Sequence, residues 1–381
     1  MIRNDFLPLA RPYISDEEYK GVYEVIKSGN WTTGPKVTEF EDAITKYLRA
    51  DEALRAVALI SCTAGLHLSL VAMGIGKGDE VIVPTWTFAA TAHVVGWVGA
   101  KVVLCDIDEK SLNMDVKKLE ELITPNTKAI IPVHMVGYPC DMDAIGAIAK
   151  KYNLTVIEDA AHAIGTKYHG KKIGNFSDLT VFSFYATKNL AMGEGGLVVS
   201  RDKEVIEKIR KLSYFGINKE AFKRYEKSGS WFYDIEELGY KYNLDSIHAV
   251  IGLSQLRKLD EMNKRRRRIA KIYKEKLTSK IRFTVDSEEH YHIYHLFPIK
   301  IPTEIIKRDD LIIELKNRNI GSSVHFIPLH LHSFYKNRFP KENFPVANKV
   351  FSEILSIPMF PSMTNDDVDY VINNLNEILD K

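Results

Sequence analysis

The chain has 381 residues, of which 45% are hydrophobic and 27% charged, and its formal net charge is +2. This length suits about two domains of about 150 residues each, and the composition is that of a soluble globular protein. The near balance of charge gives no basic field of the kind that grips a phosphate backbone. We therefore expect no nucleic-acid partner, and we exclude disordered and fibrous classes.

Membrane, secretory and metal-binding classes are also disfavoured. No run of about eighteen apolar residues is present, and the first residues, MIRNDFLPLARPY, lack the apolar core of a secretory signal, so we expect a cytoplasmic protein with no membrane span. The cysteines Cys62, Cys105 and Cys140 are too far apart for a zinc clip and odd in number. Buried thiols are expected, with no metal site.

Short apolar runs rich in valine and isoleucine alternate with helix-length segments through the first part of the chain. The runs are AVALIS (56–61), EVIVP (80–84), KVVLCD (101–106), KAIIPVH (128–134) and TVIED (155–159). Intervening segments such as AGLHLSLVAMG repeat apolar residues at intervals of three and four, which predicts crossover helices. The pattern predicts an α/β fold with a parallel sheet covered on both faces, whose ligands bind at the carboxyl ends of the strands.

The pattern changes after about residue 255, where a long charged helix is predicted. We expect a large domain over residues 1–255, including an N-terminal arm, and a smaller domain over 256–381. Four consecutive arginines (265–268) could form an anion patch, but neighbouring positions on a helix point to different faces, which favours a solvated helix or a subunit rim. The apolar periodicity fades over residues 216–243, which predicts a long loop with a functional role.

Candidate ligand groups follow the first two runs. Thr63 and Ala64 stand at a predicted helix start, where free N–H groups and a hydroxyl suit a phosphate. A plain N-cap made by Thr63 or Ser61 explains the same residues at least as well. After the second run, Trp86 and Phe88 could lie over a planar ring, although each is more often a core residue.

The fifth run ends in two acids, Glu158 and Asp159, followed by His162. Because side chains alternate along a strand, at most one of the acids faces the ligand crevice. Ala160 and Ala161 leave room for a bulky ligand to approach. A helix cap followed by a satisfied histidine accounts for the same spacing, and these residues alone favour that simpler interpretation.

The stretch FSFYATKNLAMGEGGLVV (182–199) places Lys188 among apolar, small and hydroxylic residues, with Glu194 as the single acid. Loss of hydration lowers the pKa of a lysine and exposes a nucleophilic amine, which is the condition for forming a Schiff base. A lysine that snorkels out of a loop explains the charge but not these neighbours.

Taken together, Thr63, Phe88, Asp159, Ser183 and Lys188 supply each group that pyridoxal phosphate (PLP) requires. The phosphate needs N–H and hydroxyl donors, the ring needs a stacking face, the ring nitrogen needs a carboxylate and the aldehyde needs an amine. Asp159 is the candidate that keeps the ring nitrogen protonated, and Lys188 is the candidate that holds the cofactor and shuttles a proton.

Seven motifs resemble the DegT/DnrJ/EryC1/StrS family of sugar aminotransferases nearly from end to end. They are SGNWTTGP (28–35), SCTAGLHL (61–68), PTWTFAATA (84–92), PVHMVGYPCDMDAI (132–145), EDAAHAIG (158–165), FSFYATKNLAMGEGG (182–196) and GYKYNLDSIHAVIG (239–252). The resemblance implies a fold-type-I PLP-dependent transferase with a mostly parallel sheet domain and a smaller α+β domain. It also implies a homodimer with both active sites at the subunit interface.

The same resemblance implies residue roles. Lys188 is similar to the Schiff-base lysine, Asp159 to the pyridinium partner and His162 to the residue near the phenolic oxygen of PLP. The remaining implied cofactor positions are Thr63, Ala64 and Ser183 for the phosphate, Phe88 for the ring face and Asn243 for a phosphate contact from the neighbouring subunit.

Within the family, NWTTGP, EDAAHA and GSSVHFIPLHLHSFYKNRFP (321–340) are most similar to the aminotransferases that make UDP-4-amino-4-deoxy-L-arabinose. This implies that L-glutamate aminates a UDP-linked 4-keto-pentose for cell-surface polysaccharide synthesis, with Trp31, Thr32 and His325 in the sugar pocket.

Other functions stay open at the level of the sequence. Aminotransferases acting on a 4-keto-6-deoxyhexose share nearly all the motifs, and Cys62 and Tyr185 depart from common family residues near the cofactor. A PLP-binding regulator without turnover is a further alternative. Dehydratases of the same fold carry histidine where this chain has Lys188. A nicotinamide enzyme is disfavoured because GIGKG (74–78) is followed by Asp79 where the fingerprint requires glycine.

Overall fold

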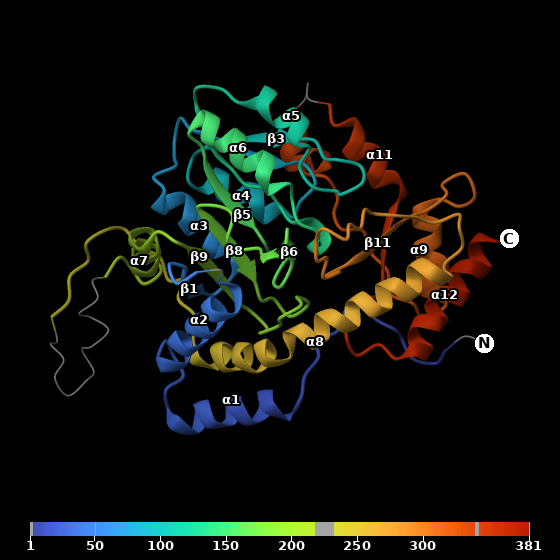
Figure 1. Ribbon diagram of the computed structural model, residues 1–381, viewed down its shortest axis with the longest axis horizontal. Helices are drawn as coiled ribbons and strands as arrows, with labels where there is room; N and C mark the ends of the chain where they lie inside the picture. Colours follow the sequence, from blue (N-terminus) through green and yellow to red (C-terminus); the bar gives the residue numbers. More distant parts are fainter. Residues whose placement is uncertain (1–2, 50, 218–231, 340–342, 381) are drawn as a thin grey trace.

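The computed structural model describes residues 3–49, 51–217, 232–339 and 343–380, and within them seven strands form one central sheet (Figure 1). Across the sheet the strands are β1 (Arg55–Leu59), β9 (Gly196–Ser200), β8 (Leu179–Ser183), β5 (Thr155–Asp159), β4 (Thr127–Ile130), β2 (Glu80–Pro84) and β3 (Lys101–Cys105). All five runs predicted from the sequence are strands of this sheet.

The sheet is mostly parallel and contains one reversed strand. β9 runs antiparallel to both β1 and β8, whereas β8, β5, β4, β2 and β3 pair in parallel. Parallel neighbours need a crossover, usually a helix, but β8 and β9 are joined by the turn 184–195 that contains Lys188. The reversal of β9 therefore comes from the same segment that carries the candidate lysine.

Helices cover both faces of the sheet, and alternate strand residues enter two cores. One core holds Val81 and Val83 of β2, and the other holds Ile82. Since β2 is buried along its whole length, it reads as a continuous apolar run. The first core is covered by α3 (Cys62–Ala72), α4 (Ala89–Trp97) and α7 (Lys203–Leu212), and the second by α2 (Pro35–Leu48), α6 (Met142–Tyr152) and α8 (Ser246–Lys276).

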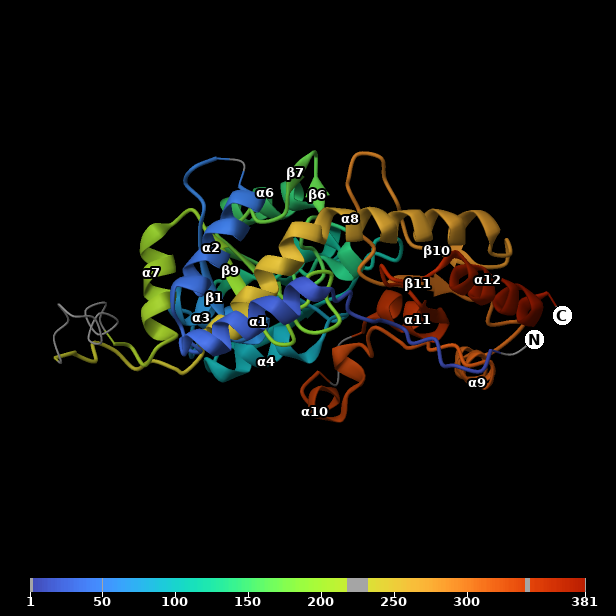
Figure 2. The ribbon, with the colours of Figure 1, turned by 90° about the horizontal axis from the view of Figure 1, so that it is seen from below.

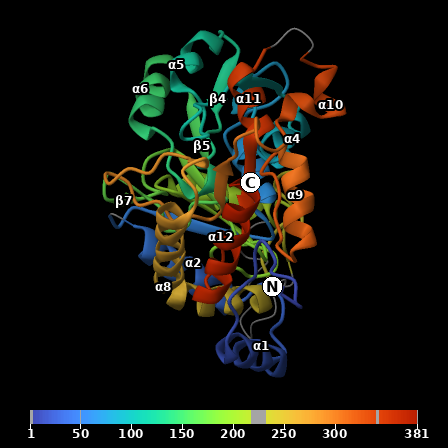
Figure 3. The same cartoon turned by 90° about the vertical axis from the view of Figure 1, so that its right-hand side faces the viewer.

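The C-terminal part has its own core, built on a three-stranded antiparallel sheet. Figure 3 shows this part from the side, with α9 and α12 towards the viewer. Its elements are β10 (Arg282–Phe283), β11 (Phe297–Lys300), α9 (Arg308–Asn317), α10 (Ser333–Lys336), α11 (Pro345–Glu353), β12 (Ile354–Ile357) and α12 (Asn365–Leu379).

The two parts of the molecule share elements at both ends of the chain. The predicted boundary between residues 255 and 256 lies inside α8, which runs from the large sheet to the C-terminal part (Figure 1). Leu7 pairs with Ile320 and belongs to the C-terminal core. The segment before α1 therefore joins the two parts, and the division into two domains stays a prediction.

Residues outside these layers form short or peripheral elements. α1 (Asp16–Ser28) packs along α8 at the outer side of the molecule, as Figure 2 shows. The others are α5 (Val116–Leu119), β6 (Lys167–Tyr168) and β7 (Lys171–Lys172). Of the long loop predicted over 216–243, residues 218–231 lie outside the described residues. None of the helices in the described ranges combines the length and apolar composition that a bilayer crossing needs.

The arginine run on α8 differs from the solvated helix face expected from its sequence. Arg266 is only 2% exposed, and its guanidinium donates to the backbone oxygens of Tyr294, His295 and Met359. A buried guanidinium needs partners for its N–H groups, and the three carbonyls all meet Nη1, whereas Nε is buried without a partner among the described residues. The expectation of a solvated face was wrong at Arg266 because a helix crossing between two cores has buried positions that charge alone does not reveal.

Close packing between α3 and the sheet depends on Gly65. A Cβ at this position would lie 2.5 Å from Val181 Cγ1 and 3.1 Å from Val198 Cγ2, which are the next layer of the core. Since real Cβ contacts are not that short, the helix approaches β8 and β9 closely only because residue 65 has no side chain. This approach brings the start of α3 against the carboxyl ends of the strands.

We predict that Gly65→Ala lowers the free energy of unfolding by about 1 to 3 kcal/mol, because the added methyl group overpacks a closed core. Gly146→Ala in α6 is the matched control, since a Cβ there meets nothing within 4 Å, and it should stabilise by about 0.5 to 1 kcal/mol. Urea unfolding measures both. A Gly65→Ala protein as stable as Gly146→Ala would contradict the packing argument.

Candidate active site

The carboxyl ends of β5 and β8 meet the start of α3, and Lys188 lies in the turn that leaves β8. The turn is closed by backbone hydrogen bonds, from Ala186 N to the oxygen of Gly193 at 3.0 Å and from Lys188 N to the oxygen of Tyr185 at 2.9 Å. The side chain of Lys188 is partly buried. The turn thus fixes the main chain of the lysine.

Loss of hydration lowers the pKa of Lys188 from 10.5 to about 8, and Cys62 and Asp159 act in the opposite direction. An amine with this pKa is partly unprotonated near neutral pH, so it can act as a nucleophile or accept a proton. The sequence prediction of a sheltered lysine is in keeping with this environment.

Asp159 is 5% exposed, and its carboxylate accepts hydrogen bonds from Thr91 Oγ1 at 2.9 Å and from Ala161 N at 3.1 Å. Burial raises the pKa of this carboxyl above its ordinary value, and the two hydrogen bonds and the nearby Lys188 offset part of that rise. Two donors and one cation are partners of a carboxylate, not of a carboxylic acid. The site is therefore built to hold a negative charge at Asp159.

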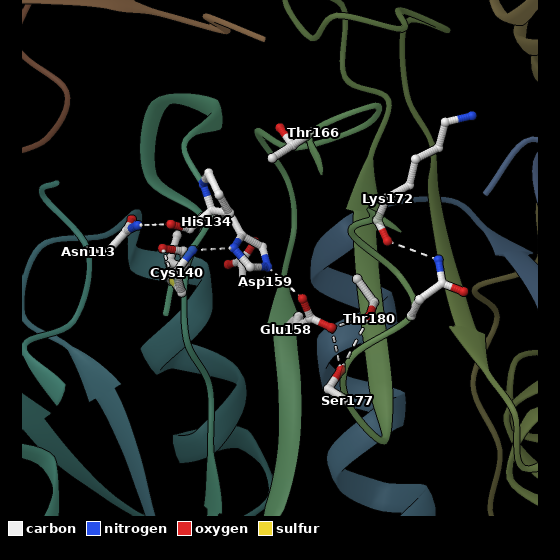
Figure 4. Close-up of polar contacts among 12 residues, drawn as sticks. Asn113, His134, Cys140, Glu158, Asp159, Thr166, Lys172, Ser177 and Thr180 are labelled. Carbon is white, nitrogen blue, oxygen red and sulfur yellow. Dashed lines mark hydrogen bonds and ion pairs between the residues drawn. The ribbon is translucent and has the colours of Figure 1, made fainter. Parts of the chain in front are cut away.

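Glu158 points to the other face of β5, as the alternation of strand side chains predicts (Figure 4). One of its oxygens lies 2.7 Å from His134 Nε2, and the other accepts from Ser177 and Thr180. His134 Nδ1 accepts from the backbone N–H of Cys140, so the proton of the neutral ring is on Nε2 and is donated to Glu158. This acid is fully engaged within the fold.

His162 lies in the turn after β5, and no helix follows it, which is contrary to the simpler cap interpretation. Its ring contacts the rings of His295, at a centroid distance of 4.3 Å, and Phe326, at 5.9 Å. His162 is 6% exposed and its Nδ1 is buried without a hydrogen-bond partner. Burial and the nearby Lys188 hold the pKa of His162 well below its ordinary value, so the ring is neutral.

At the start of α3, one backbone N–H group is capped by a side chain, as the simpler N-cap interpretation predicts. Ser61 is the N-cap residue, and its hydroxyl accepts from Ala64 N at 3.1 Å. Thr63 lies beside it in the first turn. Gly196, which pairs with Ser183, approaches the Ser61 backbone too closely for any side chain. Thr63, Ala64 and Ser183 therefore occupy one corner of the site.

The two aromatic candidates differ in position. Trp86 is fully buried and donates from Nε1 to the backbone oxygen of His325 at 3.1 Å, so it is a core residue. Phe88 is 62% exposed and contacts Phe326 at a centroid distance of 5.7 Å. Only Phe88 has a ring available to a ligand.

His325 lies near the lysine, whereas the other sugar-pocket candidates form a second group. Burial lowers the pKa of His325 to about 4, with Lys188 acting in the same direction. Trp31 is 52% exposed, and the backbone oxygens of Trp31 and Thr32 accept from Ser246 N at the start of α8. The side-chain amide of Asn243 donates to the hydroxyl of Thr33 in the same region.

Sequence reasoning missed His295 and Phe326, which enclose His162, and Asn189, which is bonded to His295. Asn189 directly follows Lys188, so its position was a signal. His295 stands in the histidine-rich run HYHIYHLF (290–297), whose periodicity is neither helical nor that of a strand. Nothing in that run indicates which histidine faces the site.

Comparisons with known proteins agree with this geometry. A sequence model of the DegT/DnrJ/EryC1/StrS aminotransferase family matches residues 12–376. The chain is 49% identical to the uncharacterized protein MJ1066 of Methanocaldococcus jannaschii, with 100% of this chain and 99% of that protein covered. It is 45% identical to the spore coat polysaccharide biosynthesis protein SpsC of Bacillus subtilis, with 99% and 98% covered.

Among solved structures, the chain is similar to Spr1654 of Streptococcus pneumoniae in its PMP form, which is assigned as a sugar aminotransferase. The TM-score is 0.91 and the identity 33%, with 98% of this chain and 99% of that chain covered. The same protein has been solved in a PLP form. The family match over nearly the whole chain and these likenesses give one conclusion: the chain belongs to the DegT/DnrJ/EryC1/StrS family of PLP-dependent sugar aminotransferases.

Proposed function

We propose that this chain transfers the amino group of L-glutamate to C4 of a nucleotide-linked 4-keto sugar, with a UDP-linked 4-keto-pentose as the leading substrate. The observation that carries the proposal is the cluster of a lysine with a lowered pKa, a carboxyl group that accepts two hydrogen bonds and a neutral imidazole with an unpartnered nitrogen. An amine, an acid and an imidazole together are the groups that amino transfer through PLP uses.

The residues present fit PLP. The buried Nδ1 of His162 has no partner among the residues that the structure describes, which costs free energy unless a ligand group meets it. Lys188 would hold the aldehyde, Asp159 the ring nitrogen, His162 the phenolic oxygen and Phe88 one face of the ring. The phosphate positions would be Thr63, Ala64 and Ser183. When bound, PLP supplies an electrophilic carbon and a ring that withdraws electrons.

The chain's own groups then have distinct tasks. The amine of Lys188 binds the cofactor covalently at rest and, once free, holds or releases a proton at Nζ, which its pKa of about 8 allows near neutral pH. The carboxylate of Asp159 keeps a proton on the atom that faces it. His162 stays neutral and adds no positive charge beside the lysine. His325, Trp31 and Thr32 bind and orient the sugar.

A homodimer with shared sites is part of the proposal. Tyr19, Tyr23 and Ile26 on α1 are 67%, 61% and 46% exposed and recur at helical spacing. Contiguous exposed apolar side chains of this kind are rare on monomers, which supports a covered face. Asn243 is proposed to reach the phosphate of the partner subunit. The cytoplasmic location stays a prediction of the sequence.

Two alternatives remain. An aminotransferase for a 4-keto-6-deoxyhexose needs the same cofactor residues and differs only in the sugar pocket. A PLP-binding regulator needs no second half-reaction. Incubation with glutamate and UDP-, GDP- and dTDP-linked 4-keto sugars, followed by mass analysis of products, separates them. A product from a 6-deoxyhexose but none from the pentose replaces the leading substrate, and no product from any sugar favours the regulator.

We predict that Lys188→Ala folds, fails to bind the cofactor covalently and is at least about a thousandfold slower, because one residue serves as both nucleophile and proton carrier. Borohydride reduction and peptide mapping should fix the cofactor to residue 188 of the unmodified chain. Lys264→Ala, on an exposed part of α8, is the control. Turnover near that of the control, or labelling of another residue, would refute the assignment.

We predict that the amine of Lys188 in cofactor-free protein reacts with acetic anhydride along a pH curve centred near 8, whereas an ordinary lysine has a pKa of about 10.4. Asp159→Asn removes a negative charge that favours the ammonium, so the curve should move to lower pH. Asp310→Asn, at an exposed site on α9, should leave it unchanged. A curve that moves to higher pH in Asp159→Asn would contradict the arrangement.

We predict that mixing Lys188→Ala and Asn243→Ala subunits restores activity. If Asn243 serves the partner's site, the mixed dimer contains one site with both residues intact. The alternative is that Asn243, whose backbone pairs with Leu59, serves the site of its own subunit. In that case each site of the mixed dimer carries one defect and no activity returns, which would exclude the shared site.

A further inference from the structure

The residue after Lys188 begins a chain of buried side-chain hydrogen bonds that the proposed function does not use. Asn189 Nδ2 donates to Asn263 Oδ1 at 2.7 Å, and Asn189 Oδ1 lies 2.9 Å from His295 Nδ1. Asn189, Asn263 and His295 are 4%, 1% and 5% exposed. Groups this buried must be paired with the correct polarity, so each bond constrains the next.

A backbone carbonyl sets which atom donates and which accepts in this series of hydrogen bonds. Asn263 Nδ2 donates to the oxygen of Ile164 at 3.3 Å, which leaves Asn263 Oδ1 as the acceptor for Asn189. The amide of Asn189 therefore presents its oxygen to His295, and His295 must donate from Nδ1. Because burial keeps the pKa of His295 well below its ordinary value, the ring is neutral and Nε2 carries no proton.

The main chain of His295 is fixed as well. Its N–H donates to the oxygen of Val136 at 2.9 Å, and its own oxygen accepts from Arg266 at 3.2 Å. Arg266 and Asn263 are separated by about one turn of α8, so the same helix holds both the backbone of His295 and, through Asn189, its ring. The His295 ring therefore has a single orientation.

This ring contacts the other side of the site. Its centroid lies 4.3 Å from that of the His162 ring, which also stacks on Phe326. His295 thus bonds to the neighbour of Lys188 with one edge and covers His162 with one face. The charged or titratable groups that act on it are His162, Lys188, Arg266 and His325, and all of them disfavour its protonation.

We propose that His295 is a positioning residue: as the neutral Nδ1–H tautomer it fixes the turn that bears Lys188 through Asn189. The consequence of this for catalysis rests on the proposed role of Lys188. The tautomer and the hydrogen bond belong to the protein itself and can be measured without any substrate.

Two substitutions separate the N–H group from the ring. His295→Asn retains a donor near the position of Nδ1 and removes the ring, whereas His295→Phe retains the ring and leaves Asn189 Oδ1 unpaired. We expect His295→Phe to lower kcat at least about tenfold with little change in KM, the scale of a lost buried hydrogen bond. His295→Asn should stay within about threefold. Equal losses in the two variants would overturn the proposal.

A second readout does not depend on turnover. In cofactor-free His295→Phe, a loosened turn should rehydrate Lys188, so its acetylation curve should move to higher pH. In His295→Asn the curve should stay close to that of the unmodified chain. His290→Phe, which removes a histidine that packs on Tyr168 outside the site, is the matched control. A curve unchanged in His295→Phe would overturn the proposal even if the enzyme's substrate were misassigned.

The closing experiment measures the tautomer by nitrogen NMR of protein labelled with 15N-histidine. The signal of His295 is identified by its loss in His295→Phe or His295→Asn. We expect a protonated Nδ1 and a bare Nε2 from about pH 6 to about pH 8, and we expect this pattern to disappear in Asn189→Ala. A protonated Nε2, titration within that range, or an unchanged signal in Asn189→Ala would overturn the proposal and leave the proposed function untouched.

Discussion

The site depends on the removal of water from one ammonium group. Burial disfavours the charged form of Lys188 and the charged form of Asp159, and each of these groups offsets part of that cost for the other. They meet because β5 and β8 are neighbours in the sheet and both end at the same edge. A parallel pair of strands places two sequence-distant charges in one dry corner, which a single loop would not achieve.

The last two residues of β5 show how one strand serves both structure and chemistry. Glu158 accepts three hydrogen bonds, from His134, Ser177 and Thr180, while the side chain of Asp159 accepts two, from Thr91 and a backbone N–H. Alternation along the strand sends them to opposite sides. The hydrogen bonds of Glu158 fix β5 to its surroundings, and the carboxylate of Asp159 can accept a further bond from a ligand.

Local sequence patterns predict much of the fold and of the site. The strands, the opposite orientations of Glu158 and Asp159 and the sheltered Lys188 follow from composition and alternation over a few residues. The sequence could not tell Trp86 from Phe88, because both flank the same turn and the burial of Trp86 comes from distant residues such as His325 and Phe351. Prediction from the sequence failed for Arg266 and His295, because the residues around them come from distant segments of the chain.

α8 has an effect on motion within the molecule. Within about one turn, Asn263 is bonded to Asn189 of the sheet part and Arg266 to Met359 of the C-terminal part. Bending of the helix between these residues would break buried polar contacts on both sides. Asn263 and Arg266 therefore fasten the sheet part and the C-terminal part to the same turn of α8, so a swing of one part against the other would have to break buried hydrogen bonds.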